Sequence, residues 1–256
     1  MSDEPAVLRE RRGRVLLITI NRPDQRNAVN AAVAEGMAAA LDELDADNEL
    51  SLGVLTGEGK GFSAGMDLKA FVAGERPYAG DRGFAGITQR SSVKPLIAAI
   101  EGFAVAGGLE IALSCDLLVA ARGAKLGIPE VKRSLVAAGG ALLRLPRVLP
   151  RGIALELALT GDPIDAERAY ELGLVNRLAP PGEAVACSLT LAETIAANGP
   201  LALAATKRIL TESADWPDAE FFTRQGEVVA PVMGSEDARE GATAFAEKRA
   251  PVWRGR

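Results

Sequence analysis

In the first quarter of the chain, continuous apolar runs alternate with a segment whose apolar residues are spaced as on one face of a helix. Residues 14–20 and 52–56 are short, almost continuous apolar runs, a pattern typical of strands buried on both faces. Between them, Asn30 is suited to cap a helix whose apolar positions recur every three or four residues, at Val33, Met37, Leu41 and Leu44. A strand, a helix and a second strand in this order predict parallel pairing through a right-handed crossover.

The same patterns predict the elements of the remaining chain. Strands are expected at residues 97–100, 117–121, 125–128 and 175–178. Helices are expected at residues 141–145, 151–159, 165–172, 183–197, 200–210, 218–229 and 235–248. A loop or mobile lid is expected at 71–81, followed by a helix that ends before Pro95. The predicted fold class is α/β, with a core of repeated βα units over residues 1–198 and a helical region over residues 199–256.

Two tight turns lead into helices and leave backbone donors free. Gly107-Gly108 precedes a buried helical pattern, and no Cβ covers the N–H groups of the first helical turn there. The turn at residues 62–68 enters a second helix, with the Met66 N–H free and Asp67 as its cap. Close strand–helix packing also explains paired glycines. However, donors at the positive end of a helix suit an oxygen that gains negative charge.

Two glutamates accompany these turns. Glu110 lies one helical turn after Gly107 among apolar neighbours, so we expect it to be buried, and a buried carboxylate needs a cation or a function. Glu130 follows Pro129 at the end of a short strand and, taken alone, is typical of a surface turn. Two backbone donors and two carboxylates together favour chemistry through an enolate beside a carbonyl group. In such chemistry the donors hold the oxyanion and the carboxylates move protons.

Composition narrows the chemistry further. The chain has no histidine, which excludes Ser–His–Asp and Cys–His mechanisms and zinc sites with histidine ligands. With only Cys115 and Cys187, a disulfide framework and a zinc site of four cysteines are excluded, and we expect no metal site. The net charge of −5 gives no support for a nucleic-acid partner. An acidic N-terminus and the lack of an apolar stretch of about 20 residues predict a cytoplasmic protein without a membrane partner.

With these residues, the chain resembles the crotonase (enoyl-CoA hydratase/isomerase) superfamily over nearly its whole length. The matching segments are residues 21–23, 26–28, 59–68, 102–110, 115–116, 127–130, 144–146, 169–175 and 245–249. The resemblance implies a spiral of ββα units and acyl-CoA thioester substrates, with no cofactor beyond the CoA of the substrate. It also implies a trimer or a dimer of trimers, with residues 199–256 as the trimerisation region.

The resemblance also assigns roles to residues. It implies that the amides of Met66 and Gly107 form an oxyanion hole and that Glu110 and Glu130 are the two catalytic glutamates of a hydratase. It implies contacts with CoA or substrate for Arg26, Ala28, Ala64, Gly65, Asp67, Leu68, Phe245 and Lys248. In relatives, the C-terminal segment sometimes contacts CoA across a subunit interface, although Lys248 also suits the C-terminal end of a helix dipole. The leading interpretation is an enoyl-CoA hydratase.

Some positions depart from the family pattern. Ala106 stands where glycine is frequent, Ser134 and Ala138 stand where hydratases commonly carry glycines, and Met66 is bulkier than the usual alanine. A Δ3,Δ2-enoyl-CoA isomerase and a carnitinyl-CoA dehydratase are therefore alternative enzymes. A non-catalytic acyl-CoA or RNA-binding relative is the alternative outside enzymes. The two glutamates and the negative charge argue against that last interpretation.

Overall fold

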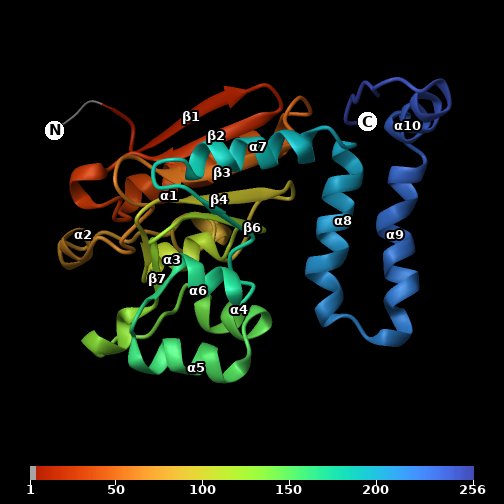
Figure 1. Ribbon diagram of the computed structural model, residues 1–256. Coiled ribbons are helices and arrows are strands. Elements are labelled where there is room, and N and C mark those ends of the chain that lie inside the picture. The colour runs from red at the N-terminus through yellow and green to blue at the C-terminus, as the bar shows by residue number, and fades with distance from the viewer. Residues whose placement is uncertain (1–3) are drawn as a thin grey trace.

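The computed structural model describes residues 4–256 and is built around a six-stranded sheet (Figure 1). The strand order is β1-β2-β3-β4-β6-β9, with β1 antiparallel to β2 and all the other neighbours parallel. These strands are β1 (Val7–Arg12), β2 (Val15–Ile20), β3 (Leu52–Gly57), β4 (Leu96–Ile100), β6 (Leu117–Ala121) and β9 (Arg177–Ala179). The predicted parallel crossover between β2 and β3 is confirmed.

The apolar strands divide their side chains between two cores, because successive side chains of a strand point to opposite faces. In β2, Leu16 and Ile18 belong to a large core that also holds the buried face of α1 (Ala31–Ala46). Val15 and Leu17 belong to a smaller core beneath α7 (Ala184–Ala196), which crosses the other face of the sheet (Figure 1). Burial on both faces explains why these strands are almost continuously apolar.

A second, three-stranded sheet continues the spiral. Its order is β5-β7-β8, with β5 parallel to β7 and β8 antiparallel to β7. The strands are β5 (Phe103–Val105), β7 (Lys125–Gly127) and β8 (Ile164–Asp165). The other helices of this core are α2 (Leu68–Val72), α3 (Gly107–Ala112), α4 (Ala141–Val148), α5 (Arg151–Thr160) and α6 (Ala166–Glu171). The predicted caps of two helices are confirmed: Asn30 accepts from the Val33 N–H, and Asp67 accepts from two amides of α2.

The prediction of a helix that ends before Pro95 is wrong. Residues 83–94 form an irregular loop, hereafter loop 83–94, after a short 3₁₀ turn at Gly80–Arg82. Gly83, Ala85 and Gly86 all adopt positive φ angles, which an α-helix cannot contain. Residues 83–88 are buried nevertheless. The spacing of apolar residues in this segment therefore reflects burial of a loop and not the buried face of a helix.

Strand β1 was not expected, because four of its six residues are charged and only Val7 and Leu8 are apolar. Only Val7 is buried, and the strand forms the edge of the sheet. Two of its arginines are paired at the surface: Arg9 with Glu43 of α1, and Arg11 with Asp47, the residue that follows α1. A polar edge strand of this kind lacks the apolar pattern by which the inner strands are predicted.

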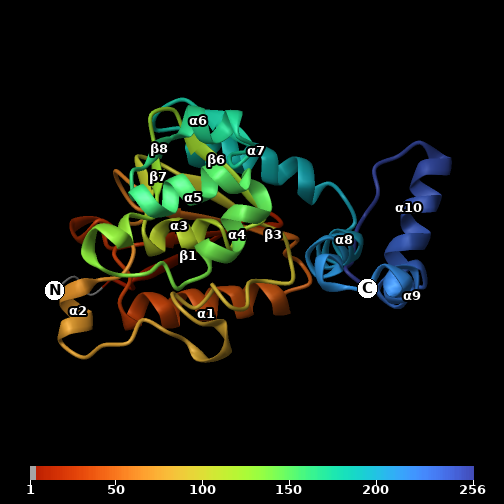
Figure 2. The same cartoon turned by 90° about the horizontal axis from the view of Figure 1, so that it is seen from below.

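The C-terminal helices stand beside the core rather than on it (Figures 1 and 2). They are α8 (Pro200–Glu212), α9 (Phe221–Met233) and α10 (Glu236–Glu247). Lys207 of α8 joins the core through an ion pair with Asp116 (2.8 Å). The Trp253 indole N–H donates to the Ala197 carbonyl (2.8 Å) at the end of α7, which ties the C-terminal tail to the core. Within residues 4–256, no helix is both long and apolar enough to cross a bilayer.

Candidate active site

The segment of residues 61–67 lies beside β5 and the start of α3, and this places two free amides together. Met66 forms a parallel bridge with Val29, in which Val29 N–H donates to the Gly65 carbonyl (2.8 Å) and Asp67 N–H donates to the Val29 carbonyl (2.9 Å). Since alternate residues of an extended segment direct their N–H groups to opposite sides, the Met66 N–H points away from Val29. Among residues 4–256, neither this amide nor that of Gly107 donates to a protein acceptor.

Close packing brings the two donor segments into contact. Gly65 has a φ of +87°, and a Cβ at that position would lie 2.7 Å from the Gly107 nitrogen. Gly107 is the first residue of α3, so its N–H has no partner inside the helix. Two unpaired amides beside each other, one of them at a helix N-terminus, form a site for an oxygen that becomes negatively charged.

Glu110 is buried, as predicted from its apolar neighbours, with 4% of its surface exposed. Its side chain reaches the N-terminus of α4, where Oε1 accepts a hydrogen bond from the Ala141 N–H (3.2 Å). A Cβ on Gly139 would lie 2.5 Å from Glu110 Oε2, so the glycine makes room for the carboxylate. The carboxylate is therefore held in one place by α3 and by the amide of the next helix.

Glu130 approaches from a different element, the 3₁₀ turn Pro129–Arg133 that follows β7. It is half-buried, and its Oε2 is a buried oxygen without a hydrogen-bond partner among the described residues. An unpaired buried carboxylate oxygen is costly in a purely structural role. This observation favours the functional interpretation of Glu130 over that of a surface turn residue.

Burial raises the pKa of both carboxyl groups. For Glu110, burial is the largest effect; the amide of Ala141 opposes it, and the nearby charge of Glu130 raises the pKa further. For Glu130, burial is again the main cause of the raised pKa. The charge of Glu130 contributes to the raised pKa of Glu110 although 20 residues separate them in sequence, and this supports the expectation that the two carboxyl groups act at one site. Such a pair can hold one proton and share its titration.

Arg144 of α4 supports the site and was not assigned a role from the sequence. Its guanidinium donates to the carbonyls of Thr88 (2.6 Å) and Gly139 (3.3 Å). Burial lowers the pKa of Arg144, and the charge of Glu110 opposes this shift. The cation and the carboxylate thus favour each other's charged forms. No local pattern in the sequence signals this role, because Arg144 and Glu110 belong to separate helices.

The residues predicted for CoA or substrate separate into two groups. The first group clusters beside the two donors: Arg26, Ala28, Ala64, Gly65, Asp67 and Leu68. The Ala64 N–H donates to the Arg26 carbonyl (3.0 Å). Arg22, also not assigned from the sequence, joins the Ala28 carbonyl to the carboxylate of Asp67 (3.0 Å). The Arg26 guanidinium lies over the Phe103 ring, 4.5 Å from its centroid.

The second group does not reach the site within one chain. Phe245 is 87% exposed on α10, and Lys248 ends that helix with a φ of +55°. In two views at right angles, α10 lies at the opposite end of the molecule from α2 (Figures 1 and 2). Any contact of these two residues with a substrate bound beside Gly107 requires another subunit.

Neither cysteine joins the site chemistry. Cys115 is buried, and burial strongly raises the pKa of its thiol, so the thiolate is disfavoured. Cys187 lies on α7, which covers the far face of the sheet from α3. Within residues 4–256, no group of acidic side chains and cysteines is arranged to hold a metal ion.

Known proteins resemble this chain in sequence and in fold. The family model for enoyl-CoA hydratase/isomerase matches residues 10–256. The enoyl-CoA hydratase EchA19 of Mycobacterium tuberculosis is 43% identical, with 98% of this chain and 97% of that protein covered. A carnitinyl-CoA dehydratase of Salmonella typhi is 42% identical, with 96% of this chain and 97% of that protein covered.

Solved structures confirm the predicted fold. The crystal structure of the enoyl-CoA hydratase EchA1 of Mycobacterium marinum is 59% identical and superposes with a TM-score of 0.97, covering 99% of this chain and 100% of that one. A carnitinyl-CoA hydratase of Mycobacterium avium is 45% identical with a TM-score of 0.80, again covering 99% and 100%. The order of motifs, the α/β spiral and the matches over the whole chain lead to one conclusion: this chain belongs to the enoyl-CoA hydratase/isomerase family, the crotonase superfamily.

Proposed function

We propose that this protein is an enoyl-CoA hydratase that reversibly adds water across the α,β double bond of a 2-enoyl-CoA thioester. The observation that carries the proposal is the pairing of Glu110 with Glu130, two carboxyl groups of raised pKa, beside the unpaired amides of Met66 and Gly107. Family relatives named enoyl-CoA hydratase support it.

In the proposed reaction, each of these groups has a distinct part. The thioester oxygen accepts hydrogen bonds from the two amides, which stabilise the enolate as water attacks Cβ. One carboxylate accepts a proton from the attacking water, and the other carboxyl group donates a proton to Cα. The added water thereby supplies both the hydroxyl group at Cβ and, through the carboxyl pair, the hydrogen at Cα. No redox step or additional cofactor is required by this balance.

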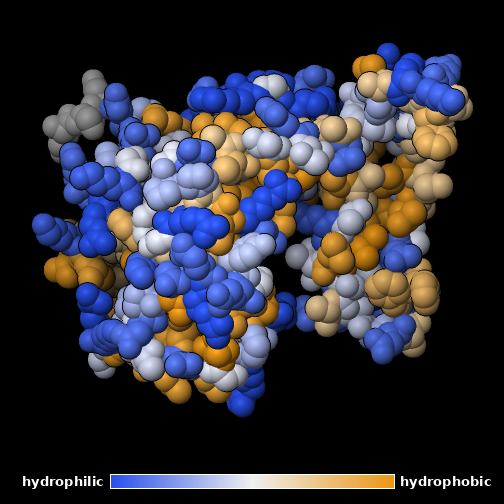
Figure 3. Space-filling view, viewed as in Figure 1, coloured by the Kyte–Doolittle hydropathy of each residue, from blue (hydrophilic) through white to orange (hydrophobic). Residues whose placement is uncertain are grey.

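Binding of the CoA part is proposed at the first cluster described above. Gly65 and Ala64 offer backbone next to the donors, and Arg26 supplies an exposed cation for a phosphate group. The proposal extends to a trimer or a dimer of trimers, in which Phe245 and Lys248 of one subunit contact CoA held by its neighbour. Apolar side chains exposed on the C-terminal helices support such an assembly (Figure 3), notably Leu210, Phe222 and Met233.

Carnitinyl-CoA dehydratase is the second candidate, because relatives with that name are about as similar to the chain as the hydratase EchA19. The same pair of carboxyl groups would then remove water from a substrate with a quaternary ammonium group. Crotonyl-CoA, a 3-enoyl-CoA and crotonobetainyl-CoA, offered to the enzyme separately, distinguish the hydratase, isomerase and carnitinyl activities by the products found in mass spectrometry. If none of the three is converted while CoA still binds, the non-catalytic alternative gains support.

The carboxyl pair is tested with Glu110→Gln and Glu130→Gln. Glutamine keeps an oxygen that can accept from the Ala141 N–H but cannot exchange a proton, so hydration should fall by about 10²–10⁴ with CoA affinity largely kept. Glu35→Gln, at an exposed position of α1, is the matched control. Full activity in both site variants would refute the proposed mechanism.

A further inference from the structure

Arg82 is a buried cation at the start of loop 83–94, outside the site described above. Its side chain is 2% exposed, and its guanidinium pairs with Asp42 (2.6 Å) and Asp45 (3.4 Å) of α1. It also donates to the carbonyls of Arg90 (3.0 Å) and Ser91 (3.1 Å), at the far end of the same loop. One side chain therefore ties both ends of the loop to α1.

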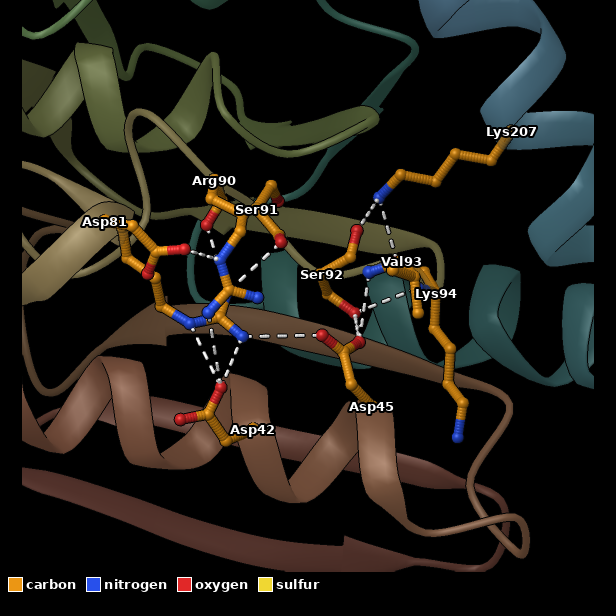
Figure 4. Close-up of polar contacts among 10 residues, drawn as sticks. Asp42, Asp45, Asp81, Arg90, Ser91, Ser92, Val93, Lys94 and Lys207 are labelled. Carbon is orange, nitrogen blue, oxygen red and sulfur yellow. Dashed lines mark hydrogen bonds and ion pairs between the residues drawn. The ribbon is translucent and has the colours of Figure 1, made fainter.

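Asp45 fixes the end of the loop a second time (Figure 4). Its Oδ1 accepts from the hydroxyl of Ser92 and from the Val93 N–H (3.0 Å). The Ser92 hydroxyl in turn accepts from the Lys94 N–H (3.0 Å). We call Arg82, Asp42, Asp45 and Ser92 the Arg82 network.

The loop held by this network contacts both parts of the candidate active site. Phe84 lies against the oxyanion-hole residue Gly107, where a Cβ would be only 2.7 Å from two ring carbons of Phe84. At the other side, the Thr88 carbonyl accepts from Arg144, the cation whose charge acts on Glu110. Between these contacts the loop is packed on α1, since a Cβ on Gly86 would lie 2.2 Å from the Ala34 carbonyl oxygen.

We propose that Arg82 is a positioning residue for the hydration reaction: with Asp42 and Asp45 it fixes the loop so that Phe84 sets the place of the Gly107 amide. This inference rests on the proposed function, because the Gly107 amide matters only if it binds a thioester oxygen. A shift of the reacting groups by about 1 Å costs as much as a hundredfold in rate. Arg82 touches no substrate in this account and acts only through Phe84 and Thr88.

A purely structural ion pair is the competing explanation, and it predicts different measurements. Loss of such a pair lowers the stability of the fold but leaves the rate of each folded molecule unchanged. A positioning role lowers kcat in the folded enzyme, because the oxyanion hole is misplaced, with little change in the affinity for the CoA part. The rate per folded site and the KM for enoyl-CoA therefore separate the two explanations.

The test uses two conservative variants of the full chain. Arg82→Lys keeps a charge but lacks the planar group that contacts Asp42, Asp45 and two carbonyls together, and Asp45→Asn keeps the shape while removing the charge. Arg9→Lys is the matched control, because Arg9 also pairs with α1, through Glu43 at the exposed surface (2.7 Å). We expect kcat to fall by about tenfold or more in both network variants, with KM close to that of the parent and no change in the control.

A probe of the oxyanion hole makes the result independent of turnover. A CoA thioester of a dimethylamino-substituted cinnamic acid absorbs at longer wavelength when its carbonyl group is polarised. On binding, the absorption maximum of the probe should move to longer wavelength by less in both network variants than in the parent and in Arg9→Lys. If the parent hydrates no enoyl-CoA, the proposed function fails, whereas the spectral shift still tests whether the network positions the hole.

The route through Phe84 is tested by a double-mutant cycle. Phe84→Leu removes the ring that contacts Gly107, so Arg82→Lys should lower kcat much less in this background than in the parent. Equal losses in both backgrounds would overturn the proposed route. Unchanged kcat and spectral shift in folded Arg82→Lys and Asp45→Asn, at temperatures well below their melting points, would overturn the positioning role itself.

Discussion

Ala106 allows a sharp prediction, because its backbone conformation is one that alanine disfavours. It precedes α3 with φ = 53° and ψ = −131°. Such a conformation costs a residue with a Cβ of the order of 1–3 kcal/mol. We therefore expect Ala106→Gly to stabilise the protein.

The size of the effect follows from two opposing contributions. Relief of strain contributes about 1–3 kcal/mol. The extra freedom of glycine in the unfolded chain takes back about 0.4–1 kcal/mol. The Ala106 methyl group is only partly buried, so its loss removes little packing. A net gain of about 1 kcal/mol remains, which for a chain of this size corresponds to a melting temperature higher by about 2–4 °C.

The matched control is Ala104→Gly, two residues earlier in β5. Ala104 is fully buried and has no positive φ, so glycine gains no strain relief there and loses one buried methyl group. This variant should lose about 1–2 kcal/mol. Both substitutions replace alanine by glycine, and they lie two residues apart. Changes of opposite sign in the free energy of unfolding are expected only if the backbone at Ala106 is strained.

The assay is thermal unfolding of the three proteins at one equal concentration, since association shifts the apparent melting temperature. The hydration rate is measured in parallel and should be kept, because the Gly107 amide is unchanged. If Ala106→Gly melts at or below the temperature of the parent while Ala104→Gly behaves as expected, the strain argument is wrong.

Three further predictions concern the site. Gly107→Ala keeps both amide donors but places a methyl carbon 2.7 Å from the ring of Phe84. Steady-state assays should show a hydration rate reduced by about tenfold or more, with an unchanged circular dichroism spectrum. A fully active variant would contradict the close contact between Gly107 and Phe84. Burial raises the pKa of Glu110 and Glu130, so the folded state holds their protons more tightly than the unfolded chain. Their contribution to stability is present below the ordinary pKa of 4.5 and is lost as the pH rises through the raised values. In urea titrations, either Glu→Gln variant should therefore gain stability relative to the parent as the pH rises above 4.5, and a constant difference would refute this. The rate should be bell-shaped in pH through the shared titration of the pair, and Cys115→Ser should leave both limbs in place; loss of a limb in that variant would implicate the thiol.

The sequence was sufficient for the features that local patterns encode. The inner strands and α1 follow from apolar periodicity, and the caps Asn30 and Asp67 follow from side-chain chemistry at helix starts. The burial of Glu110 was predicted from its neighbours, because a short apolar helix has no solvated face for a carboxylate.

Features that depend on contacts between distant segments were not predicted. Residues 83–94 have apolar positions compatible with a helix, but Arg82 and Asp45 bind the segment to α1 as a loop with positive φ angles. Arg144 lies 34 residues from Glu110, and no spacing in the sequence indicates that its charge acts on that carboxyl group. Helix α9 begins at Phe221, after a 3₁₀ turn at Asp218–Glu220 that occupies the predicted start, and it continues past Pro231 to Met233.

The two anchors of the C-terminal helices have a consequence for the oligomer proposed above. Lys207 holds α8 to the core, and Trp253 holds the tail that follows α10, so the arm formed by α8–α10 is attached at both of its ends. Its direction is then set inside each subunit before any partner arrives. Association of such pre-oriented arms loses less conformational entropy than association of arms that must first become ordered. In an oligomer, the fold of the single chain would therefore determine the distance between neighbouring active sites.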